Sequence, residues 1–226
     1  MTMQLAISNP SAALKTHTGW MAGQPSAEPL GMAGAVTHVR EGHEIFAEGE
    51  ETELFYKVVS GVVRVCKFLS DGRRQIEAFH VAGEVFGFEL GTEHILSAEA
   101  VSDCTLVSYR RRNVEMIAQK NHAVTQHLFE VAMQSLAQAQ SHSLLLGRRG
   151  AAEKVAGFLL TWAAHSADRR TVHLAMTRQD IADYLGLTIE TVSRSLSQLE
   201  RDGVIALSSV REIRIKNIDQ LEDLAA

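Results

Sequence analysis

Cysteine is scarce in this chain of 226 residues, which contains only Cys66 and Cys104. Two thiols without a Cys-x-x-Cys pair cannot by themselves complete a four-thiolate zinc or iron–sulfur site. Such sparse use of cysteine is typical of a protein that folds in a reducing compartment, where disulfides are rare. We therefore expect a cytoplasmic protein with no resident metal.

A long apolar run is also missing, although hydrophobic residues make up 46% of the chain. No stretch reaches the roughly 18 consecutive apolar residues that indicate a membrane-spanning helix. The N-terminal region lacks the basic start and apolar stretch of a secretion signal. The sequence therefore predicts neither membrane insertion nor secretion.

Proline is confined to the first part of the chain, at Pro10, Pro25 and Pro29, among many small and polar residues. This composition is typical of a flexible, loosely packed arm, which we assign to residues 1–31. The folded domains are expected after it.

Positive charge is in deficit, because the net charge is −5. The deficit is not uniform: from Arg148 to Lys216 the chain has 11 Lys and Arg against 8 Asp and Glu, whereas the rest has 11 against 19. A locally positive C-terminal part on an acidic body still attracts phosphates. The charge therefore does not exclude a partner such as DNA.

Glycine and short β-rich stretches alternate in residues 32–111. The four glycines from Gly49 to Gly83 follow one another at steps of 12, 11 and 11 residues, and Ser70–Arg73 has the composition of a hairpin turn. Regular short strands between glycine turns favour an antiparallel barrel or sandwich. The strands are expected at Leu54–Val59, Val62–Phe68, Gln75–Phe79 and Leu106–Tyr109.

A helical period replaces this pattern in residues 112–146, which contain neither proline nor glycine. The pattern predicts one helix of about 50 Å from the rise per residue. Side chains at alternating steps of four and three form a seam that suits a pair of helices in a homodimer. The alternative is a helix packed inside a monomer. The predicted dimer interface consists of Val124, Leu128, Val131, Ser135 and His142. A second stripe is expected to pack on the chain's own body: Phe129, Met133, Leu136 and Leu144.

A second domain is expected over residues 148–226, after a glycine-bounded hinge. An amphipathic helix is predicted at Ala151–Ala164 and a short strand at Thr171–Met176. Thr177, followed by an aspartate three residues later, starts a helix with a capping-box pattern, and Gly186 supplies a tight turn.

A further helix follows this turn and buries Val192, Leu196 and Leu199, so that its outer face presents polar residues. Two strands around a Ser-Ser turn then form a wing. This order is typical of a winged helix-turn-helix that binds DNA. The alternative is a helical hairpin without a DNA role, which leaves the cluster of Glu, Ser and Arg on one exposed face unexplained.

The chain resembles the CRP/FNR family of transcription regulators along nearly all of residues 34–217. The resemblance rests on the glycine-spaced β-roll, Ala82–Gly87, the long central helix and Thr177–Glu200. Within the family, Glu190–Arg194 is similar to the Glu-x-x-Ser-Arg recognition helix of the FNR and FixK branches. The resemblance implies an α+β protein in which a cyclic-nucleotide-binding-like jelly roll precedes a winged helix-turn-helix.

The resemblance further implies a homodimeric regulator, most simply an activator, that works with RNA polymerase at an inverted repeat of TTGA-like half-sites in double-stranded DNA. Arg194 has the geometry to donate two hydrogen bonds to a guanine, and Glu190 to accept one from a cytosine. We expect Glu190, Ser193 and Arg194 to read bases. Six further residues are expected to contact the DNA backbone or to form the framework of the helix-turn-helix: Thr177, Arg178, Gln179, Thr188, Thr191 and Ser197.

The β-roll departs from the pattern of the cyclic-nucleotide-binding relatives. Those relatives carry an Arg-Ser pair for the cyclic phosphate, where this chain has His94-Ile95. Neither residue replaces a permanent guanidinium charge and a hydroxyl. Residues 1–40 also lack the cysteines of the oxygen-sensing branch. We therefore expect no cofactor and binding to DNA without cAMP, as the FixK-like branch implies.

Other functions remain open at this stage. One is a regulator of the same family that is gated by an unidentified small ligand in the β-roll, and another is a haem protein, since ten histidines are present. A cupin-like enzyme would need clustered metal ligands, but His80 and His94 lack that spacing. A subunit that works only by protein contact would not need the helix-turn-helix.

Overall fold

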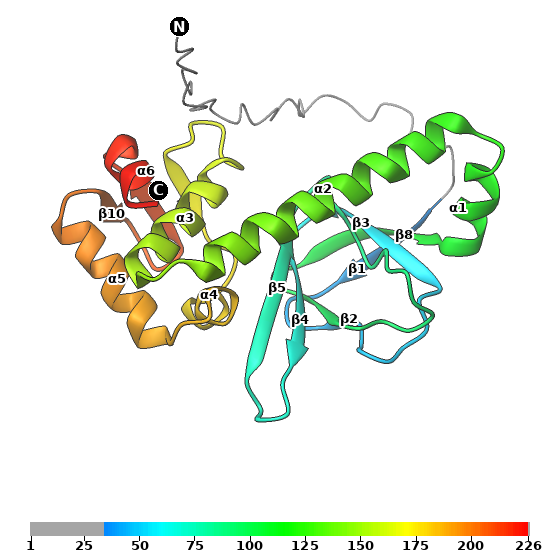
Figure 1. The fold of residues 1–226 in the computed structure, drawn as a ribbon, viewed down its shortest axis with the longest axis horizontal. Coiled ribbons are helices and arrows are strands. Elements are labelled where there is room, and N and C mark those ends of the chain that lie inside the picture. The colour runs from blue at the N-terminus through cyan, green and yellow to red at the C-terminus, as the bar shows by residue number, and fades with distance from the viewer. Residues whose placement is uncertain (1–33, 226) are drawn as a thin grey trace, which may run out of the picture.

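The computed structural model describes residues 34–225 and shows a β domain, a long helix and a second domain rich in helices (Figure 1). This architecture confirms the predicted α+β class. The arm predicted for residues 1–31 lies outside the described residues. Within residues 34–225, no helix has both the length and the apolar character needed to cross a bilayer.

The β domain consists of two four-stranded antiparallel sheets with the strand orders β1-β8-β3-β6 and β2-β7-β4-β5. Buried side chains of both sheets, including Val58, Val63 and Leu106, pack against one another and form the β-roll core. The strands are β1 (Ala35–Val39), β2 (Glu44–Phe46), β3 (Leu54–Ser60), β4 (Val63–Phe68), β5 (Arg74–His80), β6 (Val85–Phe86), β7 (Ser97–Ala100) and β8 (Cys104–Arg110).

The regularly spaced glycines of the β-roll lie at turns. Gly49, Gly61, Gly72 and Gly83 all have positive φ, between 84° and 96°. Glycine adopts this left-handed region at no steric cost, because it has no Cβ. At Gly61 an added Cβ would also lie 2.5 Å from the carbonyl oxygen of Asp103. The spacing therefore did indicate the turns.

The predicted single helix over residues 112–146 is wrong in one respect, because the structure divides it into α1 (Arg111–Ala118) and α2 (His122–Gly147). The cause is Asn121, whose extended backbone interrupts the helix and whose side chain caps α2 by accepting a 3.0 Å hydrogen bond from the Ala123 N–H. Asparagine is a preferred N-cap residue. At 26 residues, α2 spans about 39 Å by the helical rise.

The structure buries part of the predicted dimer seam of α2 and exposes the stripe that was expected to be internal. Val124 is 1% exposed and packs with residues of β3 and β8, and His142 is 7% exposed against the second domain. Leu128 also packs against the β-roll cluster. Val124, Leu128 and His142 therefore face the chain's own body, whereas Val131 of the predicted seam is half-buried and Ser135 is exposed. The stripe expected to be internal is exposed instead: Phe129 64%, Met133 46%, Leu136 49% and Leu144 76%.

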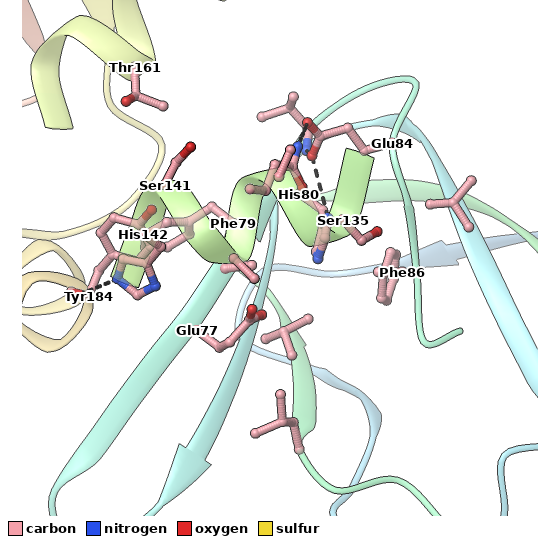
Figure 2. Close-up of a pocket in the computed structure, with 18 of the residues that line it drawn as sticks. Glu77, Phe79, His80, Glu84, Phe86, Ser135, Ser141, His142, Thr161 and Tyr184 are labelled. Atoms are coloured by element: carbon pink, nitrogen blue, oxygen red, sulfur yellow. Dashed lines mark hydrogen bonds and ion pairs between the residues drawn. The ribbon is translucent and has the colours of Figure 1, made fainter. Parts of the chain in front are cut away.

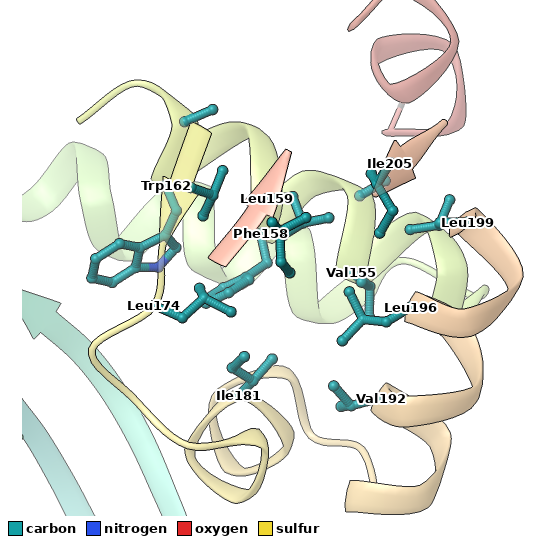
Figure 3. Close-up of a cluster of buried hydrophobic side chains, with 14 of the residues drawn as sticks. Val155, Phe158, Leu159, Trp162, Leu174, Ile181, Val192, Leu196, Leu199 and Ile205 are labelled. Carbon is teal, nitrogen blue, oxygen red and sulfur yellow. The ribbon is translucent and has the colours of Figure 1, made fainter. Parts of the chain in front are cut away.

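The second domain begins after the break at Arg148–Gly150, which follows the end of α2 at Gly147. One large cluster of buried side chains holds it together, with Phe158 and Leu159 of the first helix against Ile181, Leu196 and further residues of the later helices (Figure 3). Its elements are α3 (Ala151–Ala163), β9 (Thr171–His173), α4 (Arg178–Leu185), α5 (Ile189–Arg201), β10 (Ile205–Leu207), β11 (Glu212–Ile215) and α6 (Ile218–Ala225).

Candidate nucleic-acid interface

A complete capping box starts α4, the first helix of the predicted helix-turn-helix. The Thr177 hydroxyl accepts from the Asp180 N–H at 3.1 Å, and Asp180 Oδ2 accepts from the Thr177 N–H at 2.9 Å. This reciprocal pair satisfies N–H groups that have no partner inside the helix. Thr177 therefore serves the framework of the motif, as its sequence pattern predicted.

The turn between α4 and α5 depends on two residues. Gly186 ends α4 with φ 63° and ψ 41°, a left-handed conformation that favours glycine. Thr188 then caps α5 by accepting from the Thr191 N–H at 3.3 Å, and the hydroxyls of these two threonines lie 3.0 Å apart. The caps set the direction in which α5 leaves the turn.

The second helix, α5, has one buried and one exposed face. Val192, Leu196 and Leu199 are at most 2% exposed and belong to the domain core. Glu190 and Arg194 are exposed and one helical turn apart, with Ser193 beside them. The structure therefore brings the three predicted base-reading residues together on one open surface.

Electrostatics ties Glu190 to its neighbours on this surface. Its own backbone N–H, the Thr188 side chain and the positive charge of Arg194 lower the pKa of the Glu190 carboxyl. A carboxylate at the N-terminus of a helix is also favoured by the helix dipole. Glu190 is therefore ionised near neutral pH and presents an acceptor beside the Arg194 donors.

The remaining predicted residues flank this face. Arg178, at the first position of α4, is half-buried, and its Nη1 has no hydrogen-bond partner within the described part of the chain. Desolvation by burial lowers the pKa of this guanidinium. Gln179 is exposed and donates to Asp183 at 2.6 Å, while Ser197 is half-buried further along α5. Arg178 is thus a charged donor that is still without an acceptor.

A small sheet completes the motif behind α5. Its strand order is β10-β11-β9, and the turn between β10 and β11 forms the predicted wing. Arg211 and Arg214 are exposed on or beside this wing. They were not among the predicted site residues, although two arginines near a wing are a readable signal for phosphate contacts.

A cavity of about 720 Å³ lies where the β-roll, α2 and the second domain meet (Figure 2). At its β-roll end, Glu84 pairs with His80 at 3.4 Å and accepts from Gln138 of α2 at 3.0 Å. Burial would raise the pKa of Glu84, but the contacts with His80 and the Val81 N–H outweigh this and lower it. A carboxylate rather than a cation therefore occupies this part of the wall.

In the β-roll, His94 and Ile95 both contact the carboxylate of Glu89. His94 is 3% exposed, stacks on Phe46 with ring centroids 3.7 Å apart, and has its Nδ1 3.0 Å from Glu89. The Ile95 N–H also donates to Glu89, at 2.9 Å. Glu89 therefore places a negative charge beside the His94 ring and the Ile95 backbone, and a negative charge repels an anion.

Both cysteines are buried in strands of the β domain, Cys66 in β4 and Cys104 in β8. Burial and the nearby Glu99 raise the pKa of Cys66 to about 11, and burial raises that of Cys104. A thiol of high pKa forms little thiolate and reacts slowly. Among residues 34–225 no three His, Cys, Asp or Glu side chains gather as metal ligands would.

Comparison with known proteins gives two family matches, one to each domain. Residues 36–121 match the cyclic nucleotide-binding domain, and residues 153–224 match the Crp-like helix-turn-helix domain. The chain is 47% identical to the nitrogen fixation regulation protein FixK of Azorhizobium caulinodans, over 80% of this chain and 75% of that protein.

Two further relatives extend the similarity. The FixK protein of Rhizobium meliloti is 41% identical over 87% of this chain and 90% of its own length. The solved structure of FixK2 from Bradyrhizobium japonicum superposes with a TM-score of 0.82 at 44% identity, covering 86% of this chain and 98% of that one. Similarity therefore extends over both domains and the helix between them.

Proposed function

The chain belongs to the CRP/FNR family of transcription regulators, and from that premise we propose that it binds an inverted repeat of TTGA-like half-sites as a homodimer. It is a DNA-binding transcription regulator and not an enzyme, as its Crp-like helix-turn-helix and its FixK relatives indicate. The observation that carries the proposal is the open face of Glu190, Ser193 and Arg194 on α5.

The chemistry of this face suits direct reading of bases in the major groove. Arg194 donates two hydrogen bonds to the O6 and N7 atoms of a guanine, and Glu190 accepts from a cytosine N4 and orients Arg194. Arg178, whose Nη1 has no hydrogen-bond partner among the described residues, is proposed to donate to a phosphate oxygen. The wing arginines Arg211 and Arg214 add phosphate contacts that carry no sequence information.

The homodimer is proposed to form through the exposed stripe of α2, which comprises Phe129, Met133, Leu136 and Leu144. Their spacing of four, three and eight residues keeps them on one side of the helix. We propose that a second copy of this chain covers the stripe, because the same stripe on a parallel partner helix forms a self-complementary apolar interface. A two-fold symmetric protein also matches an inverted repeat.

The proposal includes activation of transcription together with RNA polymerase, in the cytoplasm, and binding to DNA without cAMP. Support for the last part comes from the contacts of His94 and Glu84, which place carboxylates where a cyclic phosphate would need cations. We propose no cofactor.

A gel-shift titration on an inverted repeat of TTGA half-sites, with and without cAMP, tests the proposal. The ligand-free protein is expected to bind with a Kd of about 10⁻⁸ M or tighter at moderate salt, and cAMP is expected to change nothing. A control DNA has the two half-sites scrambled at equal composition. Binding that appears only after cAMP or another small molecule is added would replace this proposal with a ligand-gated regulator.

A further inference from the structure

The β4–β5 hairpin of the β-roll contacts the helix-turn-helix directly. Arg74 reaches Asp183 of α4 at 2.8 Å and Asp180 at 2.5 Å, and Arg64 reaches Asp180 at 3.1 Å. All four side chains are at most 17% exposed. We call Arg64, Arg74, Asp180 and Asp183 the interdomain clamp, because the first two belong to the β-roll and the last two to the DNA-binding domain.

Asp180 has a double role in this clamp. Its Oδ2 closes the capping box with Thr177, while its Oδ1 accepts from both arginines. Glu99 of β7 lies 2.5 Å from Arg64 and balances the second positive charge. The β-roll therefore contacts the first turn of the helix-turn-helix. A rotation of the DNA-binding domain would separate several buried charges.

A second contact holds the same helix. Tyr184 stacks on His142 of α2 with ring centroids 3.9 Å apart and planes at 5°, and the His142 Nε2 lies 2.8 Å from the Tyr184 carbonyl oxygen (Figure 2). Phe79 of β5 approaches Tyr184 from the β-roll, at 5.4 Å between centroids. Since Tyr184 follows Asp183, the clamp and this aromatic contact act on one short helix.

These contacts do not cover the face that is proposed to read DNA. Glu190, Ser193 and Arg194 of α5 remain exposed. The interdomain clamp therefore contacts the DNA-binding domain through α4 and leaves the recognition face of α5 exposed.

We propose that Arg64 and Arg74 are positioning residues for DNA binding, which fix the orientation of the helix-turn-helix on the β-roll without a bound effector. In a dimer, the two orientations together set the distance between the recognition helices, and half-sites must match that distance. A DNA-binding domain that is free to rotate has the orientation that binds DNA for only a fraction of the time. The apparent affinity of the protein for DNA is reduced by that fraction. This inference rests on the proposed homodimer and inverted repeat.

The test measures how strongly binding depends on half-site spacing. Inverted repeats that differ only in spacer length are titrated against the wild type, Arg74→Met and Asp183→Asn. The wild type is expected to prefer one spacer over the spacer one base pair longer by about tenfold or more, because each base pair shifts and rotates the second half-site. Both variants are expected to lose affinity for the best spacer and to retain a preference of only about twofold.

Arg73→Met is the matched control, since Arg73 lies next to Arg74 but is 76% exposed and pairs with Asp71 in the β4–β5 turn. It is expected to leave affinity and spacing preference unchanged. Asp183→Asn keeps the shape of the side chain and leaves the capping box intact, so it tests the clamp even where Arg74→Met does not fold.

Three outcomes would overturn the proposal. A folded variant that binds more weakly but with the wild-type spacing preference would make the clamp a contributor to stability only. A variant that binds as the wild type does would leave the clamp without a role. A wild type that binds the repeat equally at every spacing would exclude positioning yet leave the proposed function standing, whereas a wild type that binds no repeat at all would contradict both.

Discussion

Arg194 is the side chain on which sequence discrimination is expected to depend most. It projects from the exposed face of α5, one turn from Glu190, whose pKa it helps to lower. Arginine presents a rigid fork of donors that matches the two acceptors on the major-groove edge of guanine. Ser193 is too short for such a bidentate contact and adds a single polar or methyl contact.

Replacing Arg194 with alanine is expected to cost about 1–3 kcal/mol per half-site and to relax the preference at one G·C pair. A competition gel shift with every base at that position measures both effects. Arg201→Ala, at the far end of α5, is the control and is expected to keep the preference. Selective and tight binding by Arg194→Ala would remove this residue from the base-reading set.

The ionisation of Asp180 is expected to make the stability of the protein depend on pH. Burial would raise its pKa, but hydrogen bonds from Thr177 and the charges of Arg64 and Arg74 outweigh burial and lower it. A carboxyl whose pKa is lowered on folding stabilises the native state above its unfolded pKa of about 3.9, and this stabilisation is lost as the pH falls through the folded value.

Asp180→Asn is therefore expected to lower the free energy of unfolding at pH 7, and the difference from the wild type is expected to shrink as the pH falls below about 4. Urea titrations at several pH values, followed by circular dichroism, measure the free energy of unfolding of both proteins. Asp219→Asn, at an exposed position on α6, is the control. A difference that stays constant down to pH 2 would mean that the Asp180 charge does not stabilise the fold.

At the scale of elements, α2 is the part whose two faces have different partners. One face packs on the β-roll and on α4, through Val124 and His142. The other face exposes Phe129, Met133 and Leu136, which solvent disfavours as a continuous stripe. The helix thus links the two domains of one chain and offers a surface to a second.

Met133→Glu is expected to convert the protein to monomers, because it would place two negative charges close together in an apolar seam, at a cost of several kcal/mol. Light scattering at micromolar concentration measures the mass. Gln134→Glu adds the same charge on the neighbouring, exposed position outside the stripe, and is expected to remain a dimer. A dimeric Met133→Glu protein would place the interface elsewhere.

The elements that were predictable from the sequence are those whose signals are local. Thr177, Asp180 and Gly186 specify the start of α4 and its end within ten residues, and glycine spacing marked the β-roll turns. The faces of α2 were not predictable, since Val124 and Phe129 lie on stripes of similar apolarity and only docking onto the β-roll chooses between them. The interdomain clamp was equally hidden, because Arg74 and Asp180 are 106 positions apart and an arginine in an alternating strand ordinarily faces solvent.

At the scale of the whole molecule, we propose that the β-roll acts as a platform for the DNA-binding domain. Arg74 of its β4–β5 hairpin pairs with Asp180 of α4, and His94 inside the β-roll contacts Glu89. In relatives that respond to a ligand, binding energy biases the orientation of the domains. In the proposed mechanism, the contacts of the interdomain clamp supply that bias in this chain.

The exposed stripe of α2 has a consequence for gene regulation by dosage. Only two joined copies span both halves of a palindrome, so at concentrations below the dimer dissociation constant the active species rises with the square of the amount of protein. A halving of synthesis then removes about three quarters of the assembled regulator. On the proposed dimer, a gene controlled by this protein would thus respond steeply to the amount of protein that the cell makes.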